Sequence, residues 1–322
     1  MRAILQTQPG GAETLYVGDA PVPVPAAGQL LVHVRAAGVN RADIVQREGR
    51  YPPPPGASPL LGLEVAGDVA AIGPGVADFR VGDPVLGLVA GGGYAEYVLL
   101  DQGCAVRKPD SLTYEQAASL PEAWMTAWLN LVDIADVQAG ETVLIHAGAS
   151  GVGAAAIQLA RLRGAQVVAT AGSADKVAFC RQLGATLAVD YKQEDFAAQV
   201  SAMGGADVVL DCVGGAYLEK NIQCLKADGR LVVIGLMGGV SGKLDLGRLL
   251  VKRLRVQGST LRPQPYAIKA RLTGAIRETV LPAIAAGAVQ LTLDKVFDWA
   301  DVAAAHRYME ASANLGKVVL RR

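Results

Sequence analysis

The chain has 322 residues, a length that predicts two domains, and its 30 basic and 30 acidic residues give a formal net charge of zero. Hydrophobic residues make up 51% and charged residues 19%, a composition that fills two buried cores and excludes an intrinsically disordered chain. No basic stripe marks a nucleic-acid-binding surface, and no apolar run is long enough for a membrane span.

The chain begins with MRAILQTQPGG, which has neither the apolar segment nor the cleavage site of a secretory signal. The four cysteines, Cys104, Cys180, Cys212 and Cys224, form no C-x-x-C pair. We therefore expect free thiols in a reducing compartment. Together these features predict a cytoplasmic protein with neither nucleic acid nor membrane as a partner.

Residues 1 to about 120 consist of short β-like segments separated by glycine and proline. Several segments alternate apolar and polar residues, as half-buried strands do. The clearest strands are expected at 30–39, 64–73, 83–89 and 94–100. This part of the chain predicts a mostly β domain.

From residue 113 the pattern becomes helical and then alternates strictly between strand and helix. Residues 113–135 predict a helix capped by Thr113 and interrupted at Pro121. Beyond it we expect strands at 141–147, 165–171, 186–191, 206–212, 230–235 and 254–260, and helices at 152–164, 174–184, 194–203 and 216–229. The strands are nearly continuous runs of Val, Ile and Leu, which indicates a parallel sheet covered by helices on both faces.

Six strands with helical crossovers predict a doubly wound α/β (Rossmann) sheet in the order 3-2-1-4-5-6. The C-terminal residues return to a mixed pattern, which we expect to rejoin the first domain. Helices are expected there at 266–287 and 301–312, and strands at 295–299 and 317–320. The predicted domains are therefore 1–120 with 264–322, and 121–263 inserted between them.

The main functional signal is HAGASGVG (146–153), where a buried strand ends and a helix begins. A dinucleotide pyrophosphate must touch backbone N–H groups at such a helix terminus, so side chains there must be small. Ser150 stands where a strict G-x-G-x-x-G pattern has glycine, and a purely structural turn is the alternative. The strand–loop–helix context favours dinucleotide binding. The predicted contacts are Gly148, Ser150, Gly151, Val152 and Gly153.

The end of the second sheet strand indicates which nicotinamide cofactor is bound. An NAD site places Asp or Glu there, but this chain has Gly172 and then Ser173. Lys176 supplies a positive charge for a 2′-phosphate, worth a net advantage of roughly 1.5–3 kcal/mol. Asp175 is a contrary feature, and a solvated Lys176 is the alternative. The pattern predicts NADPH.

The three histidines, His33, His146 and His306, share no ligand spacing with cysteine or acidic residues. We therefore predict no metal site and no zinc, with hydride transfer that relies on positioning and hydrogen bonds.

The sequence resembles the zinc-free quinone oxidoreductases of the medium-chain dehydrogenase/reductase superfamily. The resemblance runs the whole length and is carried by NRAD (40–43), GLEVAG (62–67), VGDPVLGL (81–88), GGGYAEY (91–97), HAGASGVGAAAIQLA (146–160), GLMGG (235–239) and NLGKVVL (314–320). It implies a GroES-like, mostly β domain with the Rossmann domain inserted, and a homodimer. It also implies NADPH, with Tyr191 beside Gly172, Ser173 and Lys176 at the 2′-phosphate, and Asn314 and Lys317 as further contacts.

Zinc-dependent members of this superfamily carry a ligand Cys where this chain has Asn40 and a ligand His where it has Leu63. The Cys-rich lobe that binds structural zinc is also missing. Within the zinc-free group the chain is most similar to the p53-inducible quinone oxidoreductases. The shared segments are QREGRYPPPPGAS (46–58), LPEAWMTAW (120–128), HAGASGVG and GLMGG.

Three residues are candidates for catalysis. Tyr51 heads a proline-rich loop, and its phenol is suited to stacking on a quinone and donating a proton or hydrogen bond; a loop anchor is the alternative. Ser150 is suited to bonding the pyrophosphate or reaching the nicotinamide, and Asn40 to bonding substrate or ribose. Beyond these, Val213, Gly235 and Met237 follow later strands and are expected at the nicotinamide and its ribose.

The sequence leaves three functions open. The first is NADPH-dependent reduction of quinones, by hydride or by stepwise electron transfer, without a metal. The second is reduction of conjugated enones or 2-alkenals, which uses the same hydride geometry. The third, least favoured, is a nucleotide-binding or regulatory protein without turnover.

Overall fold

A computed structural model describes all 322 residues. The chain forms two compact units, one of residues 1–125 with 262–322 and the other of residues 126–261. The boundaries expected from the sequence were 120/121 and 263/264. No helix is both long and apolar enough to cross a membrane.

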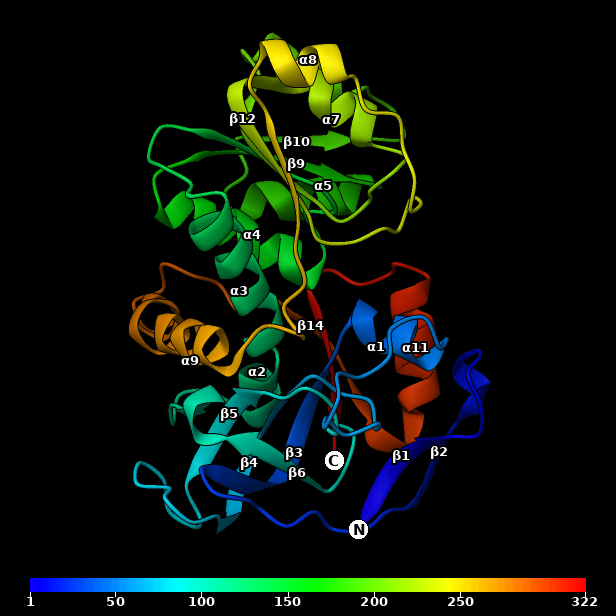
Figure 1. Ribbon diagram of the computed structural model, residues 1–322, viewed down its shortest axis with the longest axis vertical. Helices are drawn as coiled ribbons and strands as arrows, with labels where there is room; N and C mark the ends of the chain where they lie inside the picture. The colour runs from blue at the N-terminus through cyan, green and yellow to red at the C-terminus, as the bar shows by residue number, and fades with distance from the viewer. The chain divides into compact units, whose positions relative to one another are not determined.

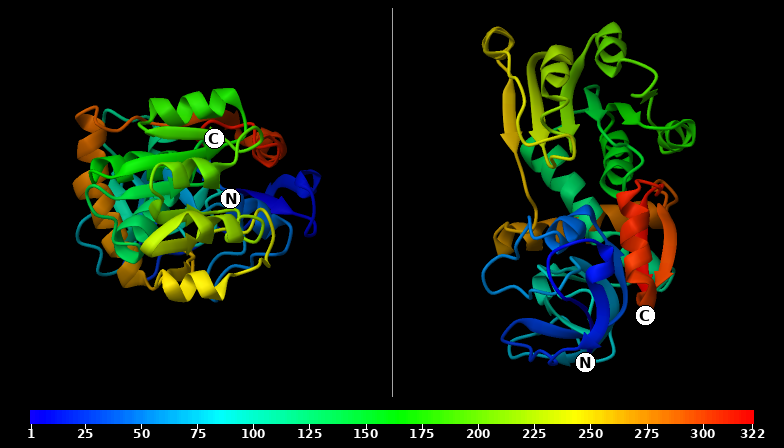
Figure 2. Two further views of the ribbon diagram at one scale, coloured as in Figure 1. Left: turned by 90° about the horizontal axis from the view of Figure 1, so that it is seen from above. Right: turned by 90° about the vertical axis from the view of Figure 1, so that its right-hand side faces the viewer.

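The second unit is built on a six-stranded parallel sheet whose order is β10-β9-β8-β11-β12-β13. Its strands are β8 (Thr142–Ile145), β9 (Gln166–Ala171), β10 (Leu187–Asp190), β11 (Ala206–Asp211), β12 (Leu225–Val233) and β13 (Arg255–Gly258). In chain order this is 3-2-1-4-5-6, so the predicted fold class is confirmed. Figure 2 shows helices on both faces of the sheet, with β13 in yellow at its outer edge.

The crossover helices of this unit pack on strands that are buried on both faces. They are α4 (Gly151–Leu162), α5 (Ala174–Gln182), α6 (Phe196–Ala202), α7 (Leu218–Cys224) and α8 (Leu246–Val251) (Figure 1). Leu144, Val168 and Val209 from the strands meet Phe196 and Ile222 from the helices in one core. Each such buried side chain contributes about 1.5–3 kcal/mol relative to an exposed one.

The predicted helix over 216–229 is wrong at its C-terminal end. Helix α7 stops at Cys224, and Leu225 already pairs with Ala206 in the sheet. A register shift follows between Ala206 and Val208, and Asp228 adopts a positive φ of 61°. This irregular start hides the strand from any period-2 pattern.

The first unit contains a seven-stranded sheet of order β14-β15-β3-β4-β5-β7, with β6 paired to β3. The strands are β3 (Gln29–Val39), β4 (Glu64–Ile72), β5 (Pro84–Leu88), β6 (Tyr97–Asp101), β7 (Ala105–Arg107), β14 (Leu293–Asp298) and β15 (Lys317–Arg321). A separate hairpin pairs β1 (Arg2–Gln6) with β2 (Leu15–Asp19). The C-terminal strand β15 pairs antiparallel with β3, which brings the end of the chain onto the N-terminal sheet.

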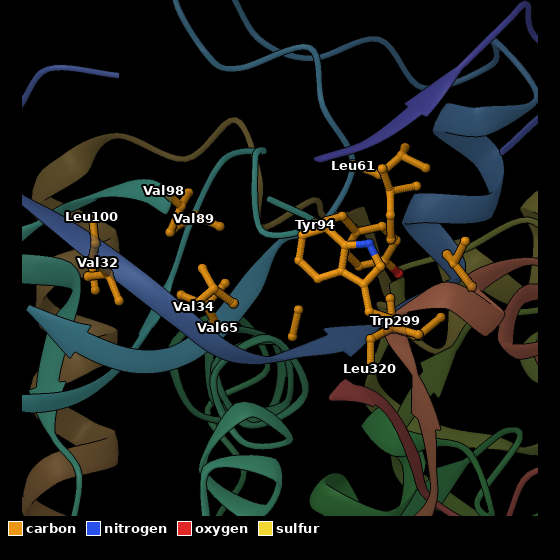
Figure 3. Close-up of a cluster of buried hydrophobic side chains, with 14 of the residues drawn as sticks. Val32, Val34, Leu61, Val65, Val89, Tyr94, Val98, Leu100, Trp299 and Leu320 are labelled. Atoms are coloured by element: carbon orange, nitrogen blue, oxygen red, sulfur yellow. The ribbon is translucent and has the colours of Figure 1, made fainter. Parts of the chain in front are cut away.

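A cluster of buried hydrophobic side chains connects distant parts of the first unit. Val32 and Val34 of β3 and Val65 of β4 pack in one cluster with Tyr94 and Trp299 (Figure 3). These residues come from segments far apart in the sequence, so the cluster joins the N-terminal sheet to the C-terminal tail.

The helices of the first unit are short, because prolines and turns interrupt them. They are α1 (Arg41–Arg47), α2 (Tyr114–Ala118), α3 (Pro121–Trp128), α9 (Tyr266–Ala275), α10 (Leu281–Ala285) and α11 (Val302–Glu310). Helix α3 runs into the second unit, where the π-helical turn η3 (Leu129–Ile134) follows it. In the first unit the π-helical turn η4 (Ile276–Val280) follows α9, and η1 (Ala12–Thr14), η2 (Gln102–Cys104) and η5 (Trp299–Asp301) are single 3₁₀ turns. Thr113 caps α2 as predicted, since its Oγ1 accepts from the Gln116 N–H at 3.2 Å. The predicted break at Pro121 separates α2 from α3.

Candidate functional site

The carboxyl ends of the parallel strands meet at one edge of the sheet in the second unit. Most of the predicted cofactor residues lie in the loops there: Gly148, Ser150, Gly151, Val152 and Gly153 after β8, Gly172, Ser173 and Lys176 after β9, Tyr191 after β10, Val213 after β11, and Gly235 and Met237 after β12. The structure therefore gathers these residues at one sheet edge. The predicted residues Asn40, Tyr51, Asn314 and Lys317 belong to the first unit.

The loop after β8 leads directly into α4 and leaves backbone donors free. Ser150 is the N-cap of this 12-residue helix, and its Oγ accepts from the Gly153 N–H at 3.0 Å. The N–H groups of Gly151 and Val152 make no hydrogen bond within the chain. Free N–H groups at the positive end of a helix dipole form an anion-binding site.

The glycines of this loop also allow α4 to pack closely on the sheet. A Cβ atom at position 148 would lie 2.8 Å from Cys180 Sγ and 2.9 Å from Ala169 Cβ. A Cβ atom at position 153 would collide with the Ala147 carbonyl oxygen. Smallness is therefore required here for helix packing, in addition to the approach of any phosphate.

The end of β9 carries no acidic residue and faces a tyrosine. A Cβ atom at Gly172 would lie 2.7 Å from the Tyr191 hydroxyl oxygen, so this hydroxyl lies directly beside Gly172. Ser173 caps α5, with its Oγ 3.4 Å from the Lys176 N–H that donates to it. Burial raises the pKa of the Cys180 thiol to about 12, and the positive charge of Lys176 opposes this shift. The charge of Lys176 therefore acts on Cys180, whose Sγ lies beside Gly148.

Hydrogen bonds join the loops after β11 and β12 to each other and to a row of buried polar side chains. Asp211 accepts from the Val213 N–H at 2.7 Å, and the Gly238 N–H donates to the Val213 carbonyl at 2.7 Å. Behind the loop, Asn221 Nδ2 donates to Asp211 at 3.1 Å. The Asn221 Oδ1 atom lies 2.7 Å from His146 Nε2, which must carry the ring proton because the amide oxygen only accepts.

Burial lowers the pKa of His146 to about 4, so its ring is neutral at physiological pH. Thr170 completes the chain, with its Oγ1 2.9 Å from His146 Nδ1. Sequence reasoning missed Asn221 and Asp211 as partners of this loop. Their signal was present, because Asp211 ends a run of Val and Leu that otherwise contains no charge after Asp207.

Comparison with known proteins identifies the family of the chain. A family model described as zinc-binding dehydrogenase matches residues 151–277, and one described as alcohol dehydrogenase GroES-like domain matches residues 26–110. The human synaptic vesicle membrane protein VAT-1 homolog is 30% identical, over 99% of this chain and 86% of its own length. The chain belongs to the medium-chain dehydrogenase/reductase superfamily.

Solved structures of this superfamily share the fold along the full chain. The quinone oxidoreductase of Escherichia coli complexed with NADPH has a TM-score of 0.90 and 28% identity, with 100% of both chains covered. The CurK enoyl reductase has a TM-score of 0.86 and 30% identity, covering 99% of this chain and 98% of its own. A structure described as an NAD-dependent alcohol dehydrogenase has a TM-score of 0.88 and 34% identity, with full coverage.

The first curated relatives of this superfamily are much longer proteins. A mycocerosic acid synthase-like polyketide synthase of Mycobacterium tuberculosis is 34% identical over 99% of this chain, but the chain spans 15% of that protein. The similarity therefore concerns one segment of the synthase.

The second unit has the features that a nicotinamide dinucleotide requires in this superfamily. Free N–H groups at α4 suit the pyrophosphate, and the loops after β11 and β12 lie at the neighbouring strand ends. The residues at this sheet edge thus fit the cofactor, which would supply hydride when bound.

In the first unit, Asn40 and Lys317 belong to a buried polar cluster with Glu64. Asn40 Nδ2 donates to Glu64 at 2.9 Å, and Lys317 Nζ donates to Asn40 Oδ1 at 2.7 Å. Lys317 also bonds the Val39 carbonyl at 3.2 Å and pairs with Glu64, so each of its three N–H donors has a partner. The predicted contacts of Asn40 and Lys317 with substrate or cofactor stay predictions, and in this conformation both side chains bond within the unit.

No group of three or more His, Cys, Asp or Glu side chains is arranged to hold a metal ion. At position 40, where zinc-dependent members of the superfamily carry a cysteine ligand, the Asn40 amide instead bonds Lys317 and Glu64. Glu64 was not predicted from the sequence. Its signal is a charge inside the apolar run LLGLEVAG.

The remaining two candidates of the first unit have different surroundings. Asn314 is buried, and its Nδ2 donates to the Gly316 carbonyl at 2.7 Å, which shapes the turn before β15. Tyr51 is partly buried after α1, and the Arg262 guanidinium lies over its ring, with Cζ 5.4 Å from the ring centroid. Burial raises the pKa of the Tyr51 phenol, with nearby Glu122 adding to the shift, so the phenol keeps its proton at neutral pH.

Proposed function

We propose that this protein reduces quinones with NADPH, without a metal. The observation that carries the proposal is the sheet edge of the second unit, where free amides of Gly151 and Val152 stand beside the uncharged end of β9. The free amides suit a pyrophosphate, and the absence of an acid at Gly172 suits an additional 2′-phosphate.

The choice of NADPH over NADH rests on three neighbouring side chains. Lys176 supplies a positive charge, while the hydroxyls of Ser173 and Tyr191 supply hydrogen bonds beside Gly172. A charged partner at a partly screened surface gives a net advantage of roughly 1.5–3 kcal/mol, which is about a ten- to hundredfold preference. The NADPH complex of the similar quinone oxidoreductase supports this choice.

Quinones are the proposed acceptors because of the resemblance to the p53-inducible quinone oxidoreductases and the half-buried Tyr51 ring. A planar phenol offers a face for stacking and an O–H for the acceptor oxygen. In the net reaction the acceptor takes a hydride from NADPH and a proton from solvent. The products are NADP⁺ and the hydroquinone, whether the electrons move together or in steps.

Conjugated enones or 2-alkenals are the second candidate class. The similarity to the CurK enoyl reductase and to a segment of the polyketide synthases favours it. Hydride would add to the β-carbon, the carbonyl oxygen would gain the charge, and a proton would complete the saturated product. A nucleotide-binding protein without turnover remains the minor alternative.

A panel of acceptors separates these functions. Purified protein is mixed with NADPH, and its oxidation is followed at 340 nm with ortho- and para-quinones, with enones and with 2-alkenals. Faster turnover of quinones supports the proposal, and turnover of enones alone replaces it with the second class. NADPH binding without turnover of any acceptor would leave the non-catalytic function.

We also propose that the protein is a homodimer. Strand β13 pairs with β12 on one side only, and its four residues are exposed. Beside it, Leu246, Leu250 and Val251 of α8 are 67%, 78% and 76% exposed. An unpaired strand edge next to exposed apolar side chains favours a second copy as the partner.

A further inference from the structure

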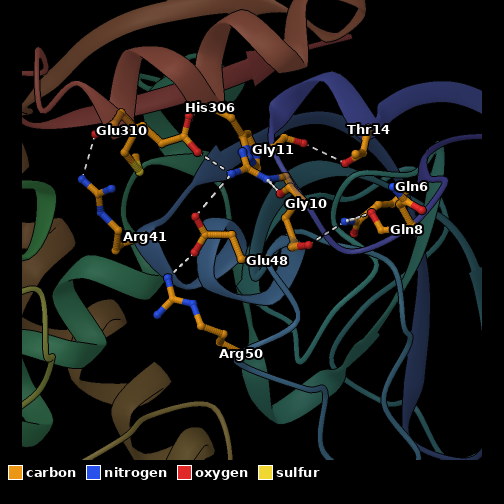
Figure 4. Close-up of polar contacts among 12 residues, drawn as sticks. Gln6, Gln8, Gly10, Gly11, Thr14, Arg41, Glu48, Arg50, His306 and Glu310 are labelled. Atoms are coloured by element: carbon orange, nitrogen blue, oxygen red, sulfur yellow. Dashed lines mark hydrogen bonds and ion pairs between the residues drawn. The ribbon is translucent and has the colours of Figure 1, made fainter. Parts of the chain in front are cut away.

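Three cations are buried in the first unit, and in two of them every side-chain nitrogen has a partner. Lys317 bonds Val39, Asn40 and Glu64. Arg47 donates to the Gly10 carbonyl at 2.9 Å, contacts His306 at 3.2 Å and pairs with Glu310. Figure 4 labels these three partners. Buried charges are expected to be paired in this way, since they lose their hydration.

Arg262, the third buried cation, departs from this rule. It is 2% exposed, and its Nε donates to the Ala90 carbonyl at 2.8 Å. Its Nη1 has one long contact of 3.5 Å to the Tyr51 carbonyl, and its Nη2 is buried with no hydrogen-bond partner. No carboxylate forms an ion pair with it. Arg262 therefore lacks the ion-pair partner that Arg47 and Lys317 have, and its Nη2 lacks an acceptor.

The carboxyl groups around Arg262 either bond other partners or are neutral at pH 7. The charge of Asp43 acts on Arg262, but its carboxylate accepts from the Asn40 N–H at 2.8 Å and from the Gly62 N–H at 3.0 Å. Glu64 is already paired with Lys317, and its second oxygen accepts from the Glu122 N–H at 2.8 Å. Burial raises the pKa of the Glu122 carboxyl to about 8, and the neighbouring Glu64 charge adds to the shift. The Glu122 carboxyl is therefore mostly neutral at pH 7. The phenol of Tyr51 is neutral as well.

A buried N–H donor with positive charge and no partner suits an oxygen that gains negative charge. We propose that Arg262 binds the carbonyl oxygen of the acceptor through Nη2, with the ring of Tyr51 alongside, and stabilises this oxygen as it becomes negative. This inference rests on the proposed reductase function and names the residue that recognises its acceptor. It applies to any conjugated carbonyl, because quinones and enones both place the new charge on that oxygen.

The reaction balances around this contact. In an enone the β-carbon receives the hydride, the electron pair moves onto the oxygen held by Arg262, and a proton from solvent or through the Tyr51 phenol completes the saturated product. In a quinone the same addition is followed by transfer of the carbon-bound hydrogen, as a proton, to the second oxygen, which gives the aromatic hydroquinone. Arg262 itself is neither oxidised nor deprotonated.

The test compares Arg262→Met and Arg262→Lys with wild type. We expect Arg262→Met to lower kcat/KM for the acceptor by about a hundredfold or more, in line with loss of one oxyanion donor. NADPH affinity should stay within about twofold, because the proposed cofactor contacts belong to the other unit. Arg262→Lys keeps the charge and should recover part of the loss. Quinone and enone arms are measured separately, to show which acceptor depends on Arg262.

Thermal stability distinguishes acceptor binding from a structural role. Because Arg262 is a buried cation without a counter-ion, Arg262→Met should keep or raise Tm, whereas a structural arginine would lose stability on substitution. Arg50→Met is the matched control. It removes a positive charge next to Tyr51 from an exposed side chain, and it should change neither kcat/KM nor Tm appreciably.

A pH profile adds an independent measurement. Glu122 lies in the field of Glu64, Lys317, Asp43 and Arg262, and also near Tyr51 and Lys269. When Glu122 ionises as pH rises through about 8, its negative charge should offset Arg262 and lower kcat/KM for the acceptor. Glu122→Gln should remove this decline.

Two results would overturn the inference without touching the proposed function. One is a wild type that turns over an acceptor while Arg262→Met keeps its kcat/KM. The other is a fall in Tm that accounts for all the lost activity. If the wild-type protein oxidises NADPH with none of the quinones, enones or 2-alkenals tested, the proposed function itself fails.

Discussion

Lys176 carries the clearest residue-level prediction, because it lies in the first turn of the helix that follows the uncharged end of β9. Lys176→Ala should raise KM for NADPH by about ten- to hundredfold, since the 2′-phosphate loses its cation. KM for NADH, which has no 2′-phosphate, should change much less. Steady-state kinetics with both cofactors measure this, and equal effects on the two would remove Lys176 from the phosphate site.

Tyr51→Phe tests the phenol without removing the ring. We expect turnover to fall by about ten- to a hundredfold if the O–H donates to the acceptor oxygen. NADPH affinity, measured by fluorescence titration, should not change. Unchanged turnover would make Tyr51 a loop anchor whose ring only packs against Arg262.

At this scale, the sequence predicted the local backbone around the candidate cofactor loop. The loop from Gly148 to Gly153 joins a strand to a helix as predicted, because strand, glycine and helix follow each other directly, and its role as a cofactor site stays a prediction. Arg262 was not found, because its missing partner is visible only when Ala90 and Tyr51 are brought to it by the fold. Glu122 was not predicted as a site residue, since its raised pKa depends on its burial in the fold and on the distant Glu64.

At the scale of elements, His146 of the β8 end is linked through Asn221 of α7 to Asp211, which holds the loop after β11. Asn221→Leu would leave His146 Nε2 without a partner, at about 1–3 kcal/mol, and Asp211 Oδ2 with only the Gly214 N–H as a donor. We expect a lower Tm and a loosened loop at Val213.

The loop effect is separable from the loss of stability. At a temperature where Asn221→Leu remains folded, KM for NADPH should rise several-fold, while the quinone KM stays near wild type. Asn221→Asp keeps the shape and serves as the conservative comparison. A variant with lower Tm but unchanged NADPH kinetics would reduce the chain of hydrogen bonds to a core feature.

The elements themselves were predicted unevenly. Buried strands such as β8 and β9 were recognised because both faces are apolar. Helices α1 and α8 were not, because each is at most seven residues long and is set by a side-chain cap: Asn40 with Asp43 for α1, and Asp245 for α8. Such caps are recognised once the neighbouring chain fixes the backbone before them.

At the scale of the whole molecule, the proposed homodimer predicts the mass of the protein in solution and the surface at which a substitution should dissociate it. Size-exclusion chromatography with light scattering should give twice the mass of the 33.3 kDa chain. Leu250→Glu places a charge on the exposed face of α8 and should shift the protein toward monomer. Val24→Glu, at an 83% exposed position of the first unit, is the control and should leave the mass unchanged. A wild-type monomer would refute the dimer.

The account as a whole depends on the sheet edge of the second unit taking up the phosphorylated cofactor. Isothermal titration calorimetry of the wild-type protein with NADPH, and with NADH under the same conditions, measures this directly. We predict saturable binding of one NADPH per chain, about ten- to a hundredfold tighter than NADH. No saturable heat with NADPH, or tighter binding of NADH, would contradict the account.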